Sequence, residues 1–289
     1  MSAPLWSFEV FPPRRNAPLG TIYRTLDGLE GLHPDFISVT YGAAGAGSDS
    51  LTTRISSDIQ DRYHIPAVAH LTCLYLTRDE ASGIAHGLKE AGVSRVLALR
   101  GDTVEGRVPA GDFAHAADLV GFLADQGFEV LAACYPERHP EATSMDADLA
   151  HLKEKVDAGA NHLISQLFLD NASFYQFLAR ARSAGITVPI EAGIMPVVNE
   201  RQIRRMVRLC DAELPEKFRT MMDRYGSDDV AMRDAGIAYA VDQIVDLVSH
   251  GVDGVHLYTM NDPEVARRIT EATASLFGHD RTASDIVAA

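Results

Sequence analysis

Eight apolar runs of strand length recur along the 289 residues, and helix-length amphipathic stretches separate them. The runs are rich in β-branched and aromatic residues, which favour strands. Eight strands alternating with helices in a chain of this length predict an α/β fold, the (β/α)8 or TIM barrel. A doubly wound open sheet is the alternative, but no GxGxxG follows the first run. We expect the strands at residues 5–11, 36–41, 67–73, 95–100, 128–135, 163–168, 189–194 and 254–260.

The stretches between the runs carry helix-stop signals. Glycine follows several of them, where a left-handed C-cap favours this residue, and we expect helices at 51–63, 79–91, 113–126, 145–158, 172–184 and 199–210. Residues 212–239 are too long for one connection, and Pro215, Gly226 and Gly236 divide them into two or three helical pieces. We therefore predict extra helices before the last strand, a single barrel domain over residues 1–278 and a loosely ordered tail over 279–289.

The composition limits the possible partners and the compartment. A formal net charge of −14 argues against binding to nucleic acid or to an anionic membrane surface. The three cysteines, Cys73, Cys134 and Cys210, form no CxxC pair, which favours a reduced intracellular protein. The N-terminus lacks the basic and apolar regions of a signal peptide, and no apolar run approaches the roughly 18–20 residues of a membrane span. We expect a cytoplasmic protein without membrane contact.

Polar side chains recur on one face of several predicted strands. Because side chains alternate along a strand, one parity is polar: Ser7 and Glu9, Ser38 and Thr40, His70 and Thr72, Arg100 with Asp102 just beyond, Gln166, and His256 and Tyr258. The opposite parity is mostly apolar: Ile37 and Val39, Ala69 and Leu71, Leu97 and Leu99, Val255 and Leu257. In a barrel the apolar parity faces the helices, so the polar parity lines the interior. Polar groups there are costly unless a ligand or a mutual network satisfies them, which predicts a site at the carboxyl-end face.

Several of these residues also have an ordinary structural explanation. Glu9 is equally consistent with a buried ion pair to Arg14 or Arg100, and His70 with a satisfied core histidine. The Gly/Ser-rich loop 42–50 is either a phosphate cradle or a flexible connector. No Cys, His and Asp cluster has metal-ligand spacing, and strand six ends in Gln166 rather than in a Schiff-base lysine, so we predict no metal and no aldolase chemistry. The remaining acid, hydrogen-bond donors and aromatic residues suit an organic cofactor and a flat heterocyclic substrate.

Nine segments resemble the methylenetetrahydrofolate reductase family, in the family's order and over nearly the whole chain. They are SFEVFPPR (7–14), ISVTYGA (37–43), AHLTC (69–73), LALRGD (97–102), CYPERHPEA (134–142), LKEKVDAGAN (152–161), ISQLFLDN (164–171), AGIMPVVNERQ (192–202) and HLYTMND (256–262). The resemblance implies a barrel that binds FAD and uses NADH or NADPH to reduce 5,10-methylenetetrahydrofolate to 5-methyltetrahydrofolate. In the family the nicotinamide and the folate use the same flavin face in turn, and the barrels usually associate into homo-oligomers.

The resemblance also implies roles for individual residues. Glu9 is similar to the general acid that protonates the folate as its methylene bridge opens, a step favoured by burial of the carboxyl. Asp102 is expected to stabilise positive charge that develops on the folate, and Gln166 completes the catalytic set. The expected folate contacts are Glu9, Asp102, Gln166, Gln202 and Tyr258. The positions that match FAD contacts are Thr40, Tyr41, His70, Arg100, Gly101, Asp102, Ala133, Tyr135, His139, Asp148 and Lys155, of which Arg100 and Lys155 supply positive charge for the diphosphate.

The chain departs from the better-known bacterial members at five positions. His151 and Glu154 stand where an asparagine and an arginine help to hold FAD, and His115 stands where a tyrosine contacts the flavin. Asp262 replaces a folate-contacting arginine, and Met206 replaces a stacking phenylalanine. Two alternatives follow: direct hydride transfer from nicotinamide to folate without a flavin, or a flavin- or pterin-binding subunit that is active only with partner proteins.

Overall fold

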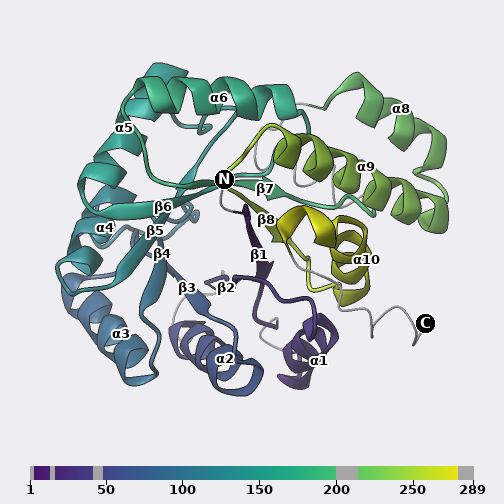
Figure 1. The fold of residues 1–289 in the computed structure, drawn as a ribbon. Coiled ribbons are helices and arrows are strands. Elements are labelled where there is room, and N and C mark those ends of the chain that lie inside the picture. Colours follow the sequence, from purple (N-terminus) through teal and green to yellow (C-terminus); the bar gives the residue numbers. More distant parts are fainter. Residues whose placement is uncertain (1–2, 14–16, 42–47, 200–213, 279–289) are drawn as a thin grey trace.

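The computed structural model describes residues 3–13, 17–41, 48–199 and 214–278. Eight parallel strands form a closed barrel in which each strand pairs with the next one along the chain. β1 closes the ring by pairing with β8, which places Glu9 opposite Tyr258. This confirms the (β/α)8 barrel (Figure 1). The strands are β1 Leu5–Val10, β2 Phe36–Val39, β3 Ala67–Thr72, β4 Arg95–Leu99, β5 Glu129–Cys134, β6 Ala160–Ser165, β7 Ile190–Ile194 and β8 Gly254–Tyr258.

Helices surround the barrel in Figure 1. They are α1 Gly20–Leu29, α2 Ser48–Tyr63, α3 Arg78–Glu90, α4 Ala116–Ala124, α5 Met145–Asp157, α6 Asn171–Ser183, α8 Glu216–Tyr225, α9 Asp229–Ser249 and α10 Pro263–Thr273, followed by the 3-10 turn Ala274–Phe277. The predicted extra helices before the last strand are α8 and α9. Within the described ranges, no helix combines the length and the apolar character that a membrane span requires. Most of the predicted helix 199–210 and the predicted tail 279–289 lie outside the described residues.

Gly236 was predicted to divide two helical pieces, and this is wrong. The residue lies inside α9, where the helix backbone packs closely against the segment after β7. A Cβ atom added at Gly236 would meet the Val197 carbonyl oxygen at 1.9 Å. The glycine is therefore needed for close approach and not for a chain break.

Strand six was predicted at 163–168, but β6 is Ala160–Ser165. The prediction followed the apolar run, and part of that run lies beyond the strand. Leu167 is buried in a cluster that includes Met195 and Phe218 of α8, so the loop after β6 has its own apolar contacts. The correct strand begins earlier and includes His162, whose ring is buried by partners on other strands.

The barrel interior has two unlike halves. Phe36, Val68, Leu97, Leu131 and Ile164, on β2 to β6, form an apolar cluster. Ser7, His162, Glu191 and His256, on β1 and β6 to β8, are buried polar residues joined by short contacts. We call these the apolar half and the polar half.

One parity prediction is wrong for strand four. Leu97 and Leu99 were expected to face the helices, but both belong to the interior cluster, and Val96 and Ala98 pack in the outer core. β4 ends at Leu99, and Gly101 has a φ of +86°, so the alternation does not continue through Arg100.

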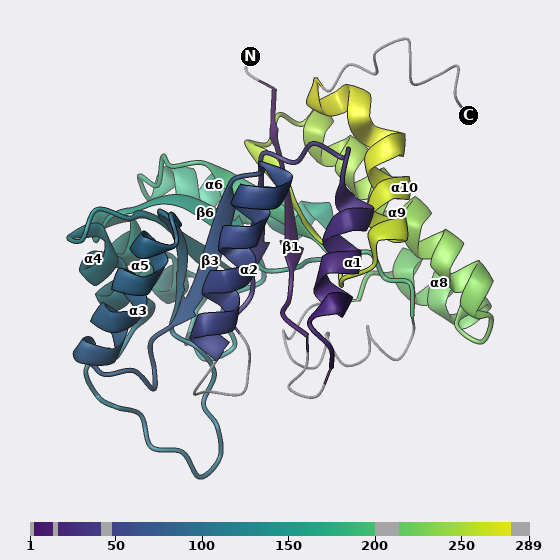
Figure 2. The same ribbon diagram turned by 90° about the horizontal axis from the view of Figure 1, so that it is seen from below.

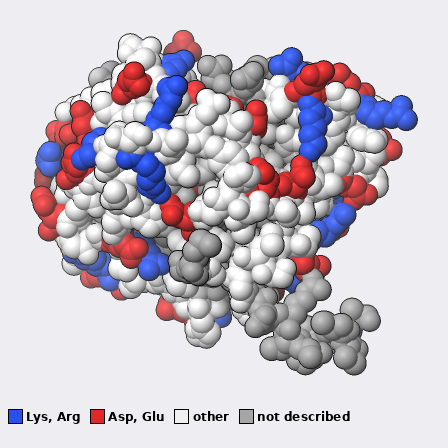
Figure 3. Space-filling view, turned by 45° about the horizontal axis from the view of Figure 1, so that its top comes forward, with Lys and Arg blue, Asp and Glu red and all other residues white. Residues whose placement is uncertain are grey.

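The loops at the carboxyl ends of the strands gather on one face, at the bottom of Figure 2, and the long loop between β4 and α4 extends furthest. Residues 100–115 make up this loop. On the face shown in Figure 3, acidic and basic side chains are interspersed rather than segregated. That view therefore shows no continuous basic surface of the kind that nucleic acid requires.

Candidate active site

A cavity of about 1180 Å³ opens at the carboxyl ends of the strands. It exceeds the roughly 300–1,000 Å³ of most small-molecule sites, so it has room for a large ligand or for two ligands. Its walls include twelve of the residues predicted from the sequence: Glu9, Thr40, Tyr41, His70, Arg100, Gly101, Asp102, Ala133, Tyr135, His139, Gln166 and Tyr258. Gln202 lies outside the described residues. The roles assigned to these residues stay predictions.

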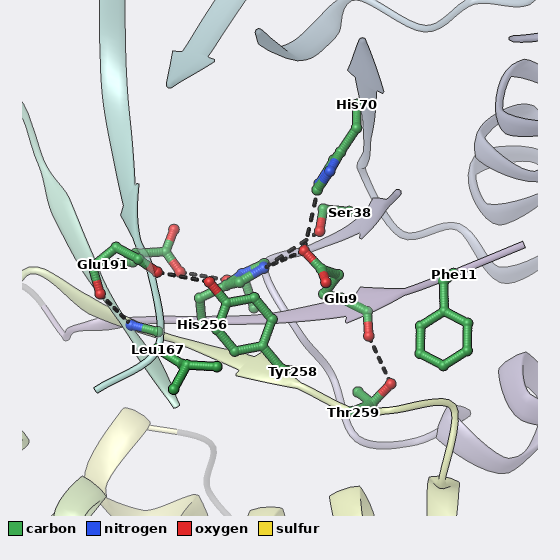
Figure 4. A network of polar contacts seen from close by, with 12 residues as sticks. Glu9, Phe11, Ser38, His70, Leu167, Glu191, His256, Tyr258 and Thr259 are labelled. Atoms are coloured by element: carbon green, nitrogen blue, oxygen red, sulfur yellow. Dashed lines mark hydrogen bonds and ion pairs between the residues drawn. The ribbon is translucent and has the colours of Figure 1, made fainter. Parts of the chain in front are cut away.

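Glu9 lies between two imidazole rings (Figure 4). Its Oε2 atom is 3.6 Å from His70 Nε2 and 3.8 Å from His256 Nε2, and 18% of its side chain is exposed. The Thr259 hydroxyl donates a hydrogen bond of 2.6 Å to the Glu9 backbone carbonyl, which fixes the end of β1 against β8. The carboxyl therefore sits at the base of the cavity on a rigid strand.

The alternative ion pair between Glu9 and Arg100 is not the arrangement found. Arg100 instead makes a two-pronged hydrogen bond to Glu141, with Nη2 2.8 Å from Oε1. The Arg100 guanidinium holds the pKa of Glu141 below its usual range. Arg14, the other partner considered, lies outside the described residues. Arg100 is thus committed to Glu141 and not to Glu9.

His70 is a neutral neighbour of Glu9. Burial lowers the pKa of this imidazole to about 4, and the nearby Glu9 carboxyl only partly opposes that effect. Its Nε2 atom is buried and makes no hydrogen bond among the described residues. A buried polar atom without a partner is uncommon, and this one lies beside the carboxyl in the cavity wall. At neutral pH, His70 therefore adds no positive charge that would hold Glu9 as a carboxylate.

Lys155 and Asp148 lie behind the cavity wall, not in it. Lys155 Nζ donates to the Ala133 carbonyl at 2.9 Å, and Asp148 accepts from the His139 backbone N–H at 2.9 Å. Burial lowers the pKa of Lys155, and its Nζ lies 5.6 Å from the centre of the Tyr135 ring. These contacts place a half-buried cation and a half-buried anion next to wall residues from β5 and the loop after it.

Gln166 and Tyr258 are held by the backbone around the end of β6. Gln166 Oε1 accepts from the Leu167 N–H at 2.9 Å, and the Tyr258 hydroxyl donates to the Ser165 carbonyl at 2.7 Å. Gly193 on β7 makes room for this arrangement, because an added Cβ would lie 2.2 Å from that same carbonyl oxygen and 2.9 Å from the Tyr258 hydroxyl. Both side chains are therefore oriented before any ligand binds.

Of the five departures from the family pattern, three lie together, one pairs elsewhere and one lies outside the described residues. The His115 and His151 rings stack with centroids 6.2 Å apart, and His151 Nδ1 is 3.2 Å from Glu154 Oε2, so these three residues contact one another outside the cavity lining. Asp262 caps α10 and pairs with Arg233 through two hydrogen bonds of 2.8 and 3.0 Å. Asp262 is thus engaged by partners on α9 and α10. Met206 lies outside the described residues.

Two buried residues beneath the cavity were missed by the sequence analysis. Glu191 is fully buried in β7, and His162 lies 2.6 Å from it. The signal was present: Glu191 is a charged residue inside an otherwise apolar strand. The late start assigned to strand six left out His162, so the pair could not be recognised.

The site suits an organic cofactor with a flat ring and an anionic tail. The unpartnered His70 Nε2 and the oriented Gln166 offer polar groups at the base, and Arg100 supplies positive charge in the wall, with Lys155 behind it. Arg100 is shared with Glu141, so an anionic ligand must compete with that carboxylate. The described ranges contain no group of His, Cys, Asp and Glu side chains that could hold a metal ion.

Known proteins resemble this chain over almost its full length. The profile of the family described as methylenetetrahydrofolate reductase matches residues 2–274. The 5,10-methylenetetrahydrofolate reductase of Pectobacterium carotovorum subsp. carotovorum is 39% identical over 265 residues, 91% of this chain and 88% of the relative. The enzyme of the same name from Escherichia coli (strain K12) is 39% identical over 264 residues, with the same coverage.

A plant relative and a solved structure extend the comparison. Methylenetetrahydrofolate reductase (NADH) 1 of Arabidopsis thaliana is 34% identical over 272 residues, 89% of this chain and 46% of the relative. An uncharacterized protein from Clostridium thermocellum that binds two copies of 5-methyl-5,6,7,8-tetrahydrofolic acid has a similar fold, with a TM-score of 0.65 over 96% of each chain. Its sequence is only 13% identical, so this likeness concerns the fold alone.

Proposed function

The chain belongs to the methylenetetrahydrofolate reductase family, and we propose from this premise that it transfers hydride from NADH or NADPH, through FAD, to 5,10-methylenetetrahydrofolate. The observation that carries the proposal is the position of Glu9 at the base of a large cavity, between two imidazoles and away from Arg100. An acid held in this way can donate a proton to a ligand that lies above it.

Glu9 acts as the general acid of the proposed reaction. It gives its proton to the nitrogen of the methylene bridge that becomes the leaving group, so the bridging carbon is left as an electrophile. Asp102, in the cavity wall, stabilises the positive charge that forms on the folate. Gln166 and Tyr258 orient the pterin through their fixed polar ends. These residues bind, orient and protonate the substrate.

FAD is held in this proposal by the wall from β2 to β5. Arg100, with Lys155 behind the wall, attracts its diphosphate, while Thr40, His70 and Tyr135 contact the rest of the molecule. When bound, FAD would accept hydride and donate it again. The nicotinamide and the folate therefore would not need to react with each other directly. We also propose a cytoplasmic homo-oligomer, as the sequence analysis predicts.

The test is an absorbance spectrum of the purified protein before and after FAD addition, followed by anaerobic addition of NADH and, separately, NADPH. We expect a flavin spectrum that bleaches with at least one nicotinamide and recovers when methylenetetrahydrofolate is added. Folate reduction by protein that contains and binds no flavin would instead establish direct hydride transfer. A flavoprotein that neither nicotinamide reduces would point to a subunit that needs an electron-transfer partner.

A further inference from the structure

Beneath Glu9, the polar half of the barrel holds a chain of side chains that the proposed reaction does not use. His162 Nε2 lies 2.6 Å from Glu191 Oε1, and the Ser7 hydroxyl donates to Glu191 Oε2. Ser7 Oγ is in turn 2.6 Å from His256 Nδ1. None of these four side chains lines the cavity. They therefore act on the site only through their neighbours.

Proton counting assigns a direction to each hydrogen bond. Glu191 is fully buried, and its two carboxyl oxygens are taken up by His162 Nε2 at 2.6 Å and by the Ser7 hydroxyl. A carboxylate only accepts hydrogen bonds, so the single hydroxyl proton of Ser7 is committed to Glu191. Ser7 Oγ must then accept from His256, which requires a hydrogen on His256 Nδ1.

The other edge of the His256 ring faces the acid. Its Nε2 atom lies 3.8 Å from Glu9 Oε2 and 3.4 Å from Ser38 Oγ (Figure 4). In a neutral imidazole, a hydrogen on Nδ1 leaves Nε2 as an acceptor. An acceptor beside a carboxyl favours the protonated acid, whereas a donor there favours the carboxylate. The tautomer of His256 thus affects whether Glu9 is favoured as the acid or as the carboxylate.

The packing around His256 holds its ring in place between Ser7 and Glu9. The residue is fully buried. Its ring stacks on Phe36 with the ring centroids 5.9 Å apart, and it packs edge to face against Tyr258 with the centroids 5.4 Å apart. The other imidazole beside Glu9 is His70, and burial lowers its pKa to about 4, so it stays neutral. The contact with Ser7 therefore decides which nitrogen of His256 carries the hydrogen.

We propose that Glu191, acting through Ser7, is a positioning residue for Glu9: it holds His256 in the Nδ1–H tautomer, so that Nε2 faces Glu9 as an acceptor and Glu9 keeps the proton that it donates. This inference rests on the proposed function of Glu9. Glu191 does not line the cavity; its effect passes through two hydrogen bonds.

The direct test is 15N nuclear magnetic resonance of histidine-labelled full-length protein without ligands. The His256 signals are assigned from their absence in His256→Gln. We expect the Nδ1–H tautomer in the wild type. In Glu191→Gln the new amide can donate to Ser7, which releases the Ser7 proton toward Nδ1, so we expect the Nε2–H tautomer there; an amide that replaces the carboxylate of a Ser-His-Asp triad acts in the same way.

The kinetic test separates the two half-reactions, flavin reduction by NADH or NADPH and flavin reoxidation by the folate. We expect Glu191→Gln and Ser7→Ala to slow the folate half-reaction on the order of a hundredfold while the nicotinamide half-reaction changes by less than about twofold, because only the former needs the proton. Thr273→Val is the matched control. It removes another fully buried hydroxyl, which donates a hydrogen bond of 2.8 Å to the Ile269 backbone carbonyl within α10. This substitution should leave both rates unchanged.

An Nε2–H tautomer in the wild type would overturn the inference, as would an unchanged folate half-reaction in Glu191→Gln. Equal slowing of both half-reactions would indicate a structural role instead. If Glu191→Gln does not fold, Ser7→Ala and the wild-type tautomer decide. Failure of the proposed function is distinguishable: Glu9→Gln would then reduce folate normally, whereas an inactive Glu9→Gln beside a normal Glu191→Gln overturns only the present inference.

Discussion

The two halves of the barrel interior solve the same packing problem in opposite ways. The apolar half fills its space with branched and aromatic side chains, as most barrels of this class do. The polar half fills it with Ser7, His162, Glu191 and His256, which satisfy one another. Glu9 lies at the top of the polar half, where its Oε2 atom is 3.6 and 3.8 Å from two imidazole nitrogens. In our proposal the apolar half serves stability, whereas the polar half serves the proton chemistry of Glu9 at the base of the cavity.

The largest expected effect is on stability in the apolar half. Leu131→Ala removes a side chain that is 2% exposed, and we expect it to lower the free energy of unfolding by about 2–5 kcal/mol. Ser7→Ala, in the polar half, should cost about 1–3 kcal/mol, because it leaves the hydrogen-bonding groups of Glu191 and His256 short of one partner. Urea unfolding of the two variants measures both values. A greater loss in Ser7→Ala than in Leu131→Ala would contradict the division of roles.

The next effect is a pH dependence at the boundary between the halves. Burial lowers the pKa of His70 from 6.5 to about 4, so between these values the unfolded chain binds a proton that the folded chain does not. The resulting stabilisation is fully present above pH 6.5 and is lost as the pH falls toward 4. It amounts to about 3 kcal/mol at most. Denaturant titrations from pH 4 to pH 7 should show a slope for the wild type that is shallower in His70→Asn; equal slopes would show that His70 titrates normally.

A smaller effect is expected on cofactor affinity. Lys155→Met keeps the length of the side chain but removes the half-buried cation next to Ala133, so we expect the FAD dissociation constant to rise about tenfold, with a weaker dependence on salt. Lys153→Met is the matched control, because Lys153 lies on the same helix and pairs with Asp157 at the surface. Fluorescence titration with FAD gives both constants. The same affinity in both variants would remove Lys155 from the proposed site.

The smallest effect concerns the outer core, away from both halves. Burial raises the pKa of Cys73 and Cys134 to about 12, so neither thiol should be reactive in the folded protein. In a Cys210→Ser background, Ellman's reagent at pH 8 should detect no thiol until denaturant is added. Rapid reaction of either thiol in the folded state would show that the outer core opens more readily than its packing indicates.

The fold was predictable from the sequence because its signal is local and repeated eight times. Strand boundaries were less predictable where tertiary contacts decided them. The apolar run around Leu167 packs beyond the end of β6, and Gly236 serves close helix packing inside α9 instead of ending a helix. Both contacts join segments that lie far apart in the sequence, so the residues next to Leu167 and Gly236 give no sign of them.

The residues that line the cavity were largely predictable from the sequence, whereas the buried polar network beneath the cavity was not. Strand parity and the family resemblance both directed attention to Glu9, and the structure places it with eleven other predicted residues around one cavity. The series of side-chain contacts that links His162, through Glu191 and Ser7, to His256 depends on strands β6, β7, β8 and β1 lying side by side in the barrel. No spacing along the sequence encodes that meeting, although a glutamate within the apolar run of β7 was a signal that could have been followed.

The most direct measurement is the anaerobic comparison of wild-type protein and Glu9→Gln, loaded with FAD, in the two separate half-reactions. We predict that NADH or NADPH bleaches the flavin of both proteins at similar rates. Methylenetetrahydrofolate should then reoxidise the wild type but reoxidise Glu9→Gln about 10²–10⁴ times more slowly, because the amide cannot supply the proton. Reoxidation of Glu9→Gln at the wild-type rate would contradict the assignment of Glu9 as the acid at the base of the cavity.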